Sequence, residues 1–361
     1  MTARASSPPN GRKWKVAVLG ATGAVGQTFI RLLSDHPWFE LAEVAASERS
    51  ARKQYRSAAR WLEGAMPDDI AEMEVRNCDA SDVSAPIVFS ALDSSVAGEI
   101  EQAFARAGKF VLSNAKNFRM DPDIPLVIPE VNADHLGLIE RQRRQRGWDG
   151  AIITNANCAA TVAAVALAPL HERFGIEKLF MTTMQAVSGA GYPGVASLDI
   201  LGNVIPYIAD EEPKVEREMR KLLGTFENGG VTNAPFEVSA QTNRVAVEHG
   251  HTVCIAASFS EHPTPEQALE TLRAWKGAES TWSLPSRPDS PLVVTDSADR
   301  PQPRRDVNAG DGMTVTVGRV RDDTILDLRM VALGHNTIRG AAGGSVLNAE
   351  LLAATGKLPP A

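Results

Sequence analysis

Residues 14–26 read WKVAVLGATGAVG, an apolar run that leads into three glycines at Gly20, Gly23 and Gly26. The run predicts a buried parallel strand, and the apolar spacing from Val25 to Leu33 predicts a helix after it. Glycines at such a junction let the backbone turn tightly and let a pyrophosphate approach the helix N-terminus. A structural turn would also use glycines, but their place between strand and helix favours a dinucleotide-binding unit.

Strand and helix signals alternate through the first half of the chain, which predicts βαβ units in a Rossmann-like doubly wound sheet. Strand signals with β-branched and polar alternation dominate the second half, which predicts an α+β domain with a mixed, largely antiparallel sheet. We expect a dinucleotide-binding domain over residues 1–156, completed by a C-terminal helix at 336–361, and a second domain over 157–335. The expected strands are 14–20, 41–46, 86–91, 110–112, 151–154, 176–187, 244–247, 252–260, 313–320 and 324–331. The expected helices are 25–33, 97–107, 159 onward, 199–203, 215–223 and 337–354, with a long loop at 284–312.

Composition narrows the class of protein. The chain has 361 residues and a net charge of −7, which disfavours nucleic-acid binding. Its longest apolar stretch, 159–170, is too short to cross a bilayer, and the polar N-terminus does not resemble a signal peptide. Cys78, Cys158 and Cys254 are too few and too scattered for a disulfide scaffold or a zinc knuckle. We expect a cytoplasmic protein without a metal site.

The end of the second expected strand bears on the choice of cofactor. It reads Ser47-Glu48-Arg49-Ser50, where an NAD site usually carries an acidic residue for the ribose. Two hydroxyls and a guanidinium suit a 2′-phosphate instead, so the sequence favours NADP, although a solvated loop would look similar. Glu48 must then point away from the phosphate.

Cys158 follows Asn155-Ala156-Asn157 and opens a long apolar helix. A thiol in the first turn of a helix feels the positive end of the dipole, which predicts a lowered pKa and a reactive thiolate. Backbone N–H groups near Asn157 and Cys158 could also hold an oxyanion. A buried structural cysteine is the alternative, and we interpret Cys78 and Cys254 as packing residues. A thiolate beside a nicotinamide implies redox chemistry at the aldehyde level through a thioester.

Such chemistry needs an acid–base group, and residues 244–251 (RVAVEHGH) offer His249 and His251. A histidine with a near-neutral pKa could shuttle the thiol proton. Strand periodicity does not choose between the two, because both lie an odd number of residues from Arg244.

Long motifs now point to a family. The segments GATGAVGQ (20–27), SERS (47–50), NANC (155–158), QAVSGAGYPGVASLDILGNVIPYI (185–208) and RVAVEHGHT (244–252) resemble aspartate-semialdehyde dehydrogenase, most closely its archaeal and fungal branch. The resemblance runs from about Lys15 to Leu352. It implies reduction of L-aspartyl-4-phosphate by NADPH with release of phosphate, in lysine, threonine and methionine biosynthesis.

The resemblance also implies residue roles. Cys158 is the nucleophile, His251 the acid–base residue, and Gln185 positions the acyl intermediate. For the substrate, it implies Arg244 at the α-carboxylate, Glu211 near the amine, and Arg119, Lys214 and Asn157 at the phosphate. For NADP it implies Gly20, Thr22, Gly23, Val25, Gly26, Ser47, Arg49 and Ser50, with Ser90, Gly189 and Asn336 nearer the nicotinamide.

The chain departs from the family in two places. It reads NANCAAT where the family usually reads NPNCST, and RVAV where RVPV is usual. The first change bears on turnover and on the acyl substrate, so a malonyl-CoA reductase, an N-acetylglutamyl-phosphate reductase and a silent NADP-binding protein stay as alternatives. The family forms homodimers and homotetramers, and the loop DRPQPRRDVNAGDGM (299–313) is a candidate subunit contact.

Overall fold

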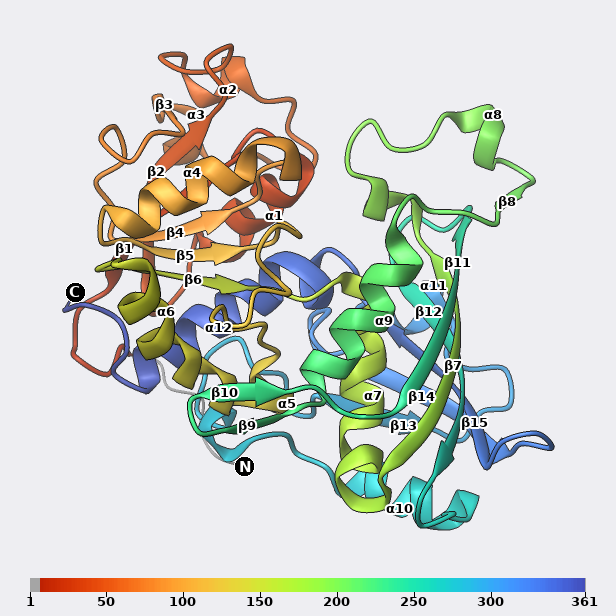
Figure 1. Ribbon diagram of the computed structural model, residues 1–361. Coiled ribbons are helices and arrows are strands. Elements are labelled where there is room, and N and C mark those ends of the chain that lie inside the picture. Colours follow the sequence, from red (N-terminus) through yellow and green to blue (C-terminus); the bar gives the residue numbers. More distant parts are fainter. Residues whose placement is uncertain (1–6, 361) are drawn as a thin grey trace.

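The computed structural model describes residues 7–360, which form two α/β units side by side (Figure 1). The first contains a six-stranded sheet in which every neighbouring pair is parallel, in the order β3-β2-β1-β4-β5-β6. This is the strand order of a dinucleotide-binding fold, as the sequence predicts. Its strands are β1 (Trp14–Leu19), β2 (Phe39–Ala46), β3 (Val75–Asn77), β4 (Ile87–Ser90), β5 (Phe110–Ser113) and β6 (Ala151–Thr154).

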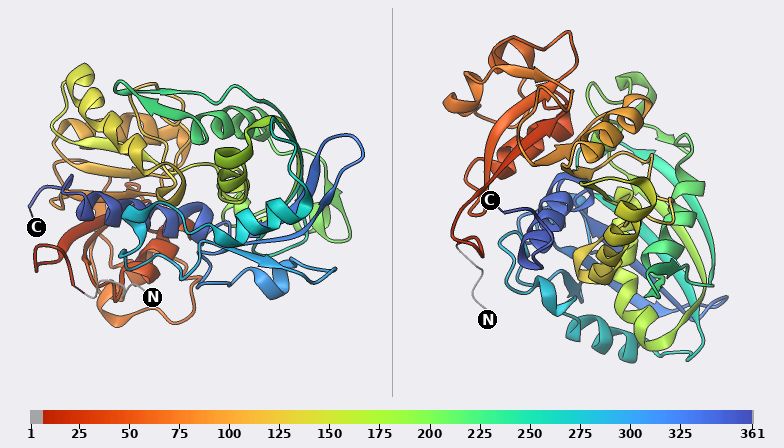
Figure 2. Two further views of the ribbon diagram at one scale, coloured as in Figure 1. Left: turned by 90° about the horizontal axis from the view of Figure 1, so that it is seen from below. Right: turned by 60° about the vertical axis from the view of Figure 1, so that its left-hand side comes forward.

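Helices cover both faces of this sheet. Side chains of α1 and α12 share one apolar core with the sheet, and α4 shares the other. The C-terminal α12 therefore packs on the first sheet although it follows the second in sequence, and Figure 2 shows it beside the N-terminal strands. The helices of this unit are α1 (Ala24–Leu33), α2 (Tyr55–Ala58), α3 (Asp68–Ala71), α4 (Ser94–Arg106), α5 (Pro129–Asn132), η1 (Ala133–Gly137), α6 (Leu138–Arg146), η4 (Ile338–Ala342) and α12 (Gly343–Ala354).

The second unit is built on a seven-stranded sheet in the order β13-β14-β15-β12-β7-β11-β8. Most neighbours are antiparallel, with parallel pairs at β13–β14 and β7–β11, so the expected mixed sheet is confirmed. Its strands are β7 (Ile176–Gln185), β8 (Val204–Ile205), β11 (Glu237–Val245), β12 (His251–Phe259), β13 (Leu292–Thr295), β14 (Val315–Asp322) and β15 (Leu328–Gly334); β9 (Thr225–Glu227) and β10 (Gly230–Thr232) form a separate hairpin.

One face of the seven-stranded sheet packs on helices. α7 and α9 lie between this sheet and the first unit (Figure 1), and α7, α9 and α10 contribute to one apolar core with it. The helical elements of this unit are α7 (Cys158–Phe174), η2 (Val187–Ala190), α8 (Ser197–Ile200), α9 (Glu211–Leu222), α10 (Pro265–Ala274), η3 (Glu279–Thr281) and α11 (Pro303–Asp306). Among the helices of residues 7–360, none has both the length and the apolar character needed to cross a membrane.

Several expected boundaries were wrong. The strand expected at 244–247 is the end of β11, which begins at Glu237 and stops at Val245, where a tight turn begins. The strand expected at 324–331 begins at Leu328, because Asp323 accepts two backbone N–H groups and holds a turn there. The expected loop 284–312 contains β13 and α11.

The expected helix at 337–354 begins with a π-helical turn, η4, in which the Gly340 N–H donates to the His335 carbonyl five residues earlier. Gly340 packs directly on Cys158: a Cβ on it would lie 2.5 Å from the Cys158 Cβ. The wider turn thus brings the C-terminal segment against the start of α7, and π-turns are frequent at functional sites.

Candidate active site

The nucleotide turn has the geometry that its glycines predict. Gly20 adopts φ +72°, and a Cβ there would lie 2.6 Å from the Ala91 carbonyl oxygen. A Cβ on Gly26 would collide with the Gly20 carbonyl, so α1 could not pack on the turn. Gly23 is the N-cap of α1 and offers no side-chain cap, which leaves the first N–H groups of the helix for an anion.

A large cavity of about 1000 Å³ lies at the carboxyl ends of β2 and β3. Its lining includes Ser47, Glu48, Arg49 and Cys78. The glycine turn at 20–26, the N-terminus of α1 and this cavity together fit a dinucleotide. Cys78 also packs against the apolar core beneath this cavity, so its interpretation as a packing residue is confirmed.

The three residues predicted near the nicotinamide have different surroundings. Asn336 is buried, accepts the Gly250 N–H (2.8 Å) and donates to Ser188 Oγ (2.8 Å). Gly189 lies against Arg244 and His251, since a Cβ on it would lie 2.8 Å from Arg244 Nη1 and 3.2 Å from His251 Nε2. Ser90 differs: its side chain is fully buried and interacts with the Glu101 carboxyl instead of facing the nucleotide turn.

Cys158 is the first residue of α7, one residue earlier than expected. Asn157 is the N-cap, and its Oδ1 accepts the N–H groups of Ala159 (2.9 Å) and Ala160 (3.1 Å). His251 Nε2 lies 3.1 Å from Cys158 Sγ, so the predicted reactive thiol contacts one of the two histidines predicted for acid–base chemistry. His249 does not reach the thiol; its Nδ1 lies 3.0 Å from Ser188 Oγ and its ring stacks on His335.

The expected lowered pKa of the Cys158 thiol is wrong. Burial, followed by the negative charge of Glu211, raises the pKa of Cys158 to about 12, although part of the residue reaches solvent. Arg119, Arg244 and the Ala159 N–H act in the opposite direction and are outweighed. The helix N-terminus alone does not generate a thiolate here.

The expected near-neutral imidazole is also wrong. Burial, the Arg244 guanidinium and His335 lower the pKa of His251 to about 3, so the ring is neutral at physiological pH. The Ala186 N–H donates to Nδ1 (3.1 Å), and this network assigns the ring proton to Nε2. The ring therefore presents an N–H to Sγ rather than a free base.

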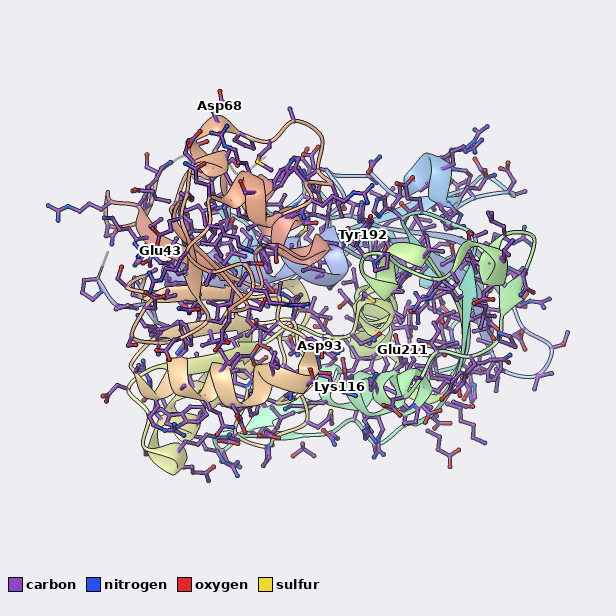
Figure 3. The ribbon with its side chains drawn as sticks, turned by 90° about the horizontal axis from the view of Figure 1, so that it is seen from above. Glu43, Asp68, Asp93, Lys116, Tyr192 and Glu211 are labelled. Atoms are coloured by element: carbon purple, nitrogen blue, oxygen red, sulfur yellow. The ribbon has the colours of Figure 1, made fainter. Side chains whose placement is uncertain are left out.

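Glu211 contacts three of the other side chains that were predicted at the active site. Its Oε1 accepts from Asn157 Nδ2 (2.7 Å) and from Gln185 Nε2 (3.1 Å), and its Oε2 lies 3.7 Å from Lys214 Nζ. Arg244 is buried beside them and donates to the Ala186 carbonyl (2.8 Å). Figure 3 places Glu211 and Lys116 where the two units meet.

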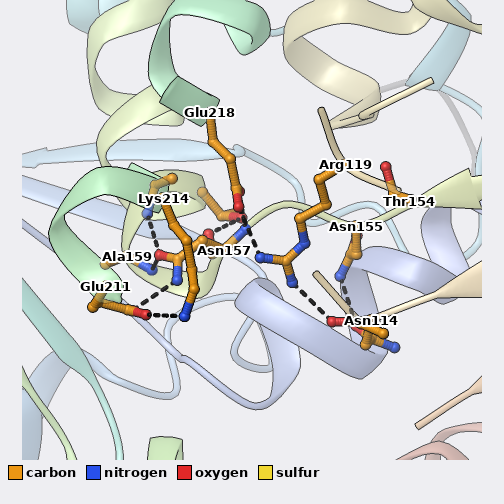
Figure 4. A network of polar contacts seen from close by, with 12 residues as sticks. Asn114, Arg119, Thr154, Asn155, Asn157, Ala159, Glu211, Lys214 and Glu218 are labelled. Atoms are coloured by element: carbon orange, nitrogen blue, oxygen red, sulfur yellow. Dashed lines mark hydrogen bonds and ion pairs between the residues drawn. The ribbon is translucent and has the colours of Figure 1, made fainter. Parts of the chain in front are cut away.

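The predicted phosphate residues Arg119 and Lys214 line one cavity of about 470 Å³. Lys116 and Arg217 line it too, and sequence reasoning missed both. It also missed Glu218, which connects Arg119 to the turn before Cys158 (Figure 4). The spacing of residues 211, 214 and 218 along one helix face was the available signal.

We expect Cys158 to react with iodoacetamide at a rate that still rises at pH values of about 10, because only the thiolate reacts and its pKa is raised. Glu211→Gln removes a charge that raises this pKa, so alkylation at mildly alkaline pH should become faster. Glu212→Gln is the matched control, since the Glu212 carboxylate accepts the Thr242 backbone N–H on β11 and is not a cause of the raised thiol pKa. An alkylation rate that stops rising at a pH below the pKa of an ordinary thiol would contradict this account.

Comparison with known proteins identifies the family. Residues 15–139 match the family model described as semialdehyde dehydrogenase, NAD binding domain, and residues 167–339 match the semialdehyde dehydrogenase dimerisation domain. The chain is 49% identical to the aspartate-semialdehyde dehydrogenase of Archaeoglobus fulgidus over 341 residues (94% of this chain, 98% of the relative) and 48% identical to that of Trichophyton rubrum over 349 residues (94% and 96%). The crystal structure of the Candida albicans aspartate-semialdehyde dehydrogenase with NADP superposes with a TM-score of 0.87 at 44% identity, covering 95% of this chain and 99% of the other. The chain therefore belongs to the aspartate-semialdehyde dehydrogenase family and is similar to its archaeal and fungal members.

Proposed function

We propose that this chain catalyses the NADPH-dependent reductive dephosphorylation of L-aspartyl-4-phosphate to L-aspartate 4-semialdehyde through a thioester on Cys158. The observation that carries the proposal is the 3.1 Å contact between Cys158 Sγ and His251 Nε2 at the start of α7. The names of the relatives agree with it. We place the reaction in the cytoplasm, where free thiols persist, as a step of lysine, threonine and methionine biosynthesis.

The charges around the thiol complement this substrate group by group. Arg244 faces a carboxylate, Glu211 an ammonium, and the cavity with Arg119 and Lys214 a phosphate. An ammonium on Glu211 neutralises the charge that raises the pKa of Cys158, so the substrate itself favours the thiolate. A malonyl thioester has no ammonium, so it would leave Glu211 without a partner, which disfavours a malonyl-CoA reductase.

The chain's own groups then act in sequence. Cys158, which is partly exposed, loses its thiol proton to solvent water; Sγ then attacks the acyl carbon, and phosphate leaves into the cavity at Arg119 and Lys214 with the electrons of the broken C–O bond. The Asn157 N–H is already bonded to Glu218 at 2.5 Å, so the expectation that it holds the oxyanion is corrected and the Cys158 N–H is assigned that role. NADPH, when bound, supplies the hydride that reduces the thioester.

His251 acts at the sulfur. Its Nε2–H points at Sγ and stabilises the charge that sulfur carries when the C–S bond breaks and the aldehyde forms. Burial lowers the pKa of His251 most, and a substrate carboxylate on Arg244 would offset part of the further lowering that this guanidinium causes.

For the cofactor, we propose NADP with its 2′-phosphate at Ser47, Arg49 and Ser50. Arg49→Ala should raise the KM for NADP about 10- to 100-fold, because a charged hydrogen bond contributes about 1.5–3 kcal/mol. The KM for NAD should stay nearly unchanged, since NAD lacks the phosphate. Steady-state kinetics with both cofactors check this, and an equal rise for both would contradict it.

We also propose a homodimer, with a tetramer as a further assembly. The outer face of the seven-stranded sheet carries Phe180, which is 46% exposed, and the segment between η2 and α9 carries Leu198, which is 90% exposed. Apolar side chains exposed to this degree are typical of protein interfaces. The loop 299–313 stays a candidate contact.

Phosphate-dependent formation of NADPH from L-aspartate 4-semialdehyde and NADP tests the proposed function. Turnover only with a malonyl semialdehyde plus CoA, or only with the N-acetylglutamyl substrate, would favour the related reductases. Binding of NADP without turnover of any of these would favour a silent protein.

A further inference from the structure

One face of α9 carries four charged residues at spacings of three and four: Glu211, Lys214, Glu218 and Lys221. The proposed function uses the first two, at the substrate amine and the phosphate. The other two are among the most buried charged side chains of the helix, since Glu218 is 2% and Lys221 4% exposed. Burial of a charge needs compensation, so their partners show what they do.

The Glu218 carboxylate joins two parts of the site. Its Oε2 accepts the backbone N–H of Asn157 (2.5 Å), the residue before the nucleophile. Its Oε1 accepts from Arg119 Nη1 (2.9 Å), the guanidinium at the phosphate cavity. Figure 4 shows the carboxylate between these two groups. One side chain thus contacts both the turn that carries the thiol and the cation that faces the leaving group.

Separate contacts hold the backbone around Arg119. The Lys221 ammonium donates to the carbonyl oxygens of Arg119 (2.7 Å), Asp121 (2.8 Å) and Ile124 (2.9 Å). Glu218 therefore holds one end of the guanidinium, the Asn114 carbonyl holds the other by accepting from Nη2 (2.8 Å), and Lys221 fixes the loop that carries the side chain. A substitution at Glu218 leaves these backbone contacts in place.

We propose that Glu218 is a positioning residue that aligns the phosphate-binding Arg119 with the nucleophile turn. The inference rests on the proposed function, because it takes the cavity at Arg119 as the phosphate site. Through Asn157, Glu218 also removes one N–H from the oxyanion site and directs the acyl oxygen to the Cys158 N–H.

The reverse reaction, oxidation of the semialdehyde, separates the alignment of the thiol from the binding of phosphate at Arg119. Oxidation of the semialdehyde to the thioester needs the aligned thiol but no phosphate, and appears as a burst of NADPH in phosphate-free buffer. Transfer of the acyl group to phosphate needs Arg119 in place. Glu218→Gln keeps an amide oxygen for the Asn157 N–H but turns a neutral amide, rather than a carboxylate, toward Arg119.

We expect Glu218→Gln to raise the KM for phosphate about tenfold or more while the burst rate stays within about threefold of the wild type. Glu218→Ala removes both contacts, so the burst should slow as well. Glu216→Gln is the matched control on α9, because Glu216 accepts the Ala240 N–H away from the site, and it should change neither quantity.

A phosphate KM in Glu218→Gln equal to that of Glu216→Gln would overturn the inference. An equal slowing of the burst and of the phosphate step would also overturn it, since this indicates general damage to the site. A wild-type enzyme that forms NADPH with no phosphate dependence at any stage would overturn the proposed function itself, a result distinct from both.

Discussion

Cys158→Ala should abolish phosphate-dependent reduction of NADP by the semialdehyde, with a loss of about 10⁴-fold or more. The loss follows because no other thiol lies within reach of His251: Cys254 lies on β12 and faces Thr182 and Val331 on the neighbouring strands. Alanine at position 158 keeps the helix start, since the cap comes from Asn157. Steady-state assays with purified protein measure the effect.

Cys254→Ala is the control for the first prediction and should retain nearly full activity. Retention of more than a trace of activity in Cys158→Ala would contradict the covalent mechanism, because the thioester could then not form on that sulfur.

His251→Ala should lower kcat by about 10²- to 10⁴-fold, the range typical of a lost acid–base group. The variant removes the N–H that stabilises sulfur, while the positions of Arg244 and Glu211 rest on other contacts. His249→Ala serves as the matched control, because His249 lies two residues away but contacts Ser188 instead of the thiol. A larger loss in His249→Ala than in His251→Ala would contradict the assignment.

The fold was predictable where the residue pattern within one short segment decides the structure of that segment. The apolar run 14–19 and the glycines after it define β1, the turn and α1, and the alternation that follows defines a parallel sheet. Boundaries failed where tertiary contacts decide them, as at Leu328, which follows a turn held by Asp323. The hairpin of β9 and β10 was missed although Asn228-Gly229, both with positive φ, form its turn and are a recognisable signal.

The site was predictable as a set of residue types, and the structure brings Cys158, His251, Gln185, Glu211 and Arg244 together. The protonation states were not predictable, because they depend on burial and on charges from distant segments. Gly340 was missed because it packs on the nucleophile turn from far along the chain, and a single sequence carries no pairing signal for such a contact. Glu218 was missed although its helical spacing from Glu211 and Lys214 was a signal, and that spacing did not show its contact with Asn157.

Trapping the acyl-enzyme tests the central claim most directly. The enzyme is mixed with semialdehyde and NADP in phosphate-free buffer, quenched in acid, digested and analysed by mass spectrometry. The account predicts an aspartyl adduct on the peptide containing Cys158, which disappears when phosphate is added before the quench. Formation of NADPH with no adduct on that peptide, or with an adduct on another residue, would contradict it.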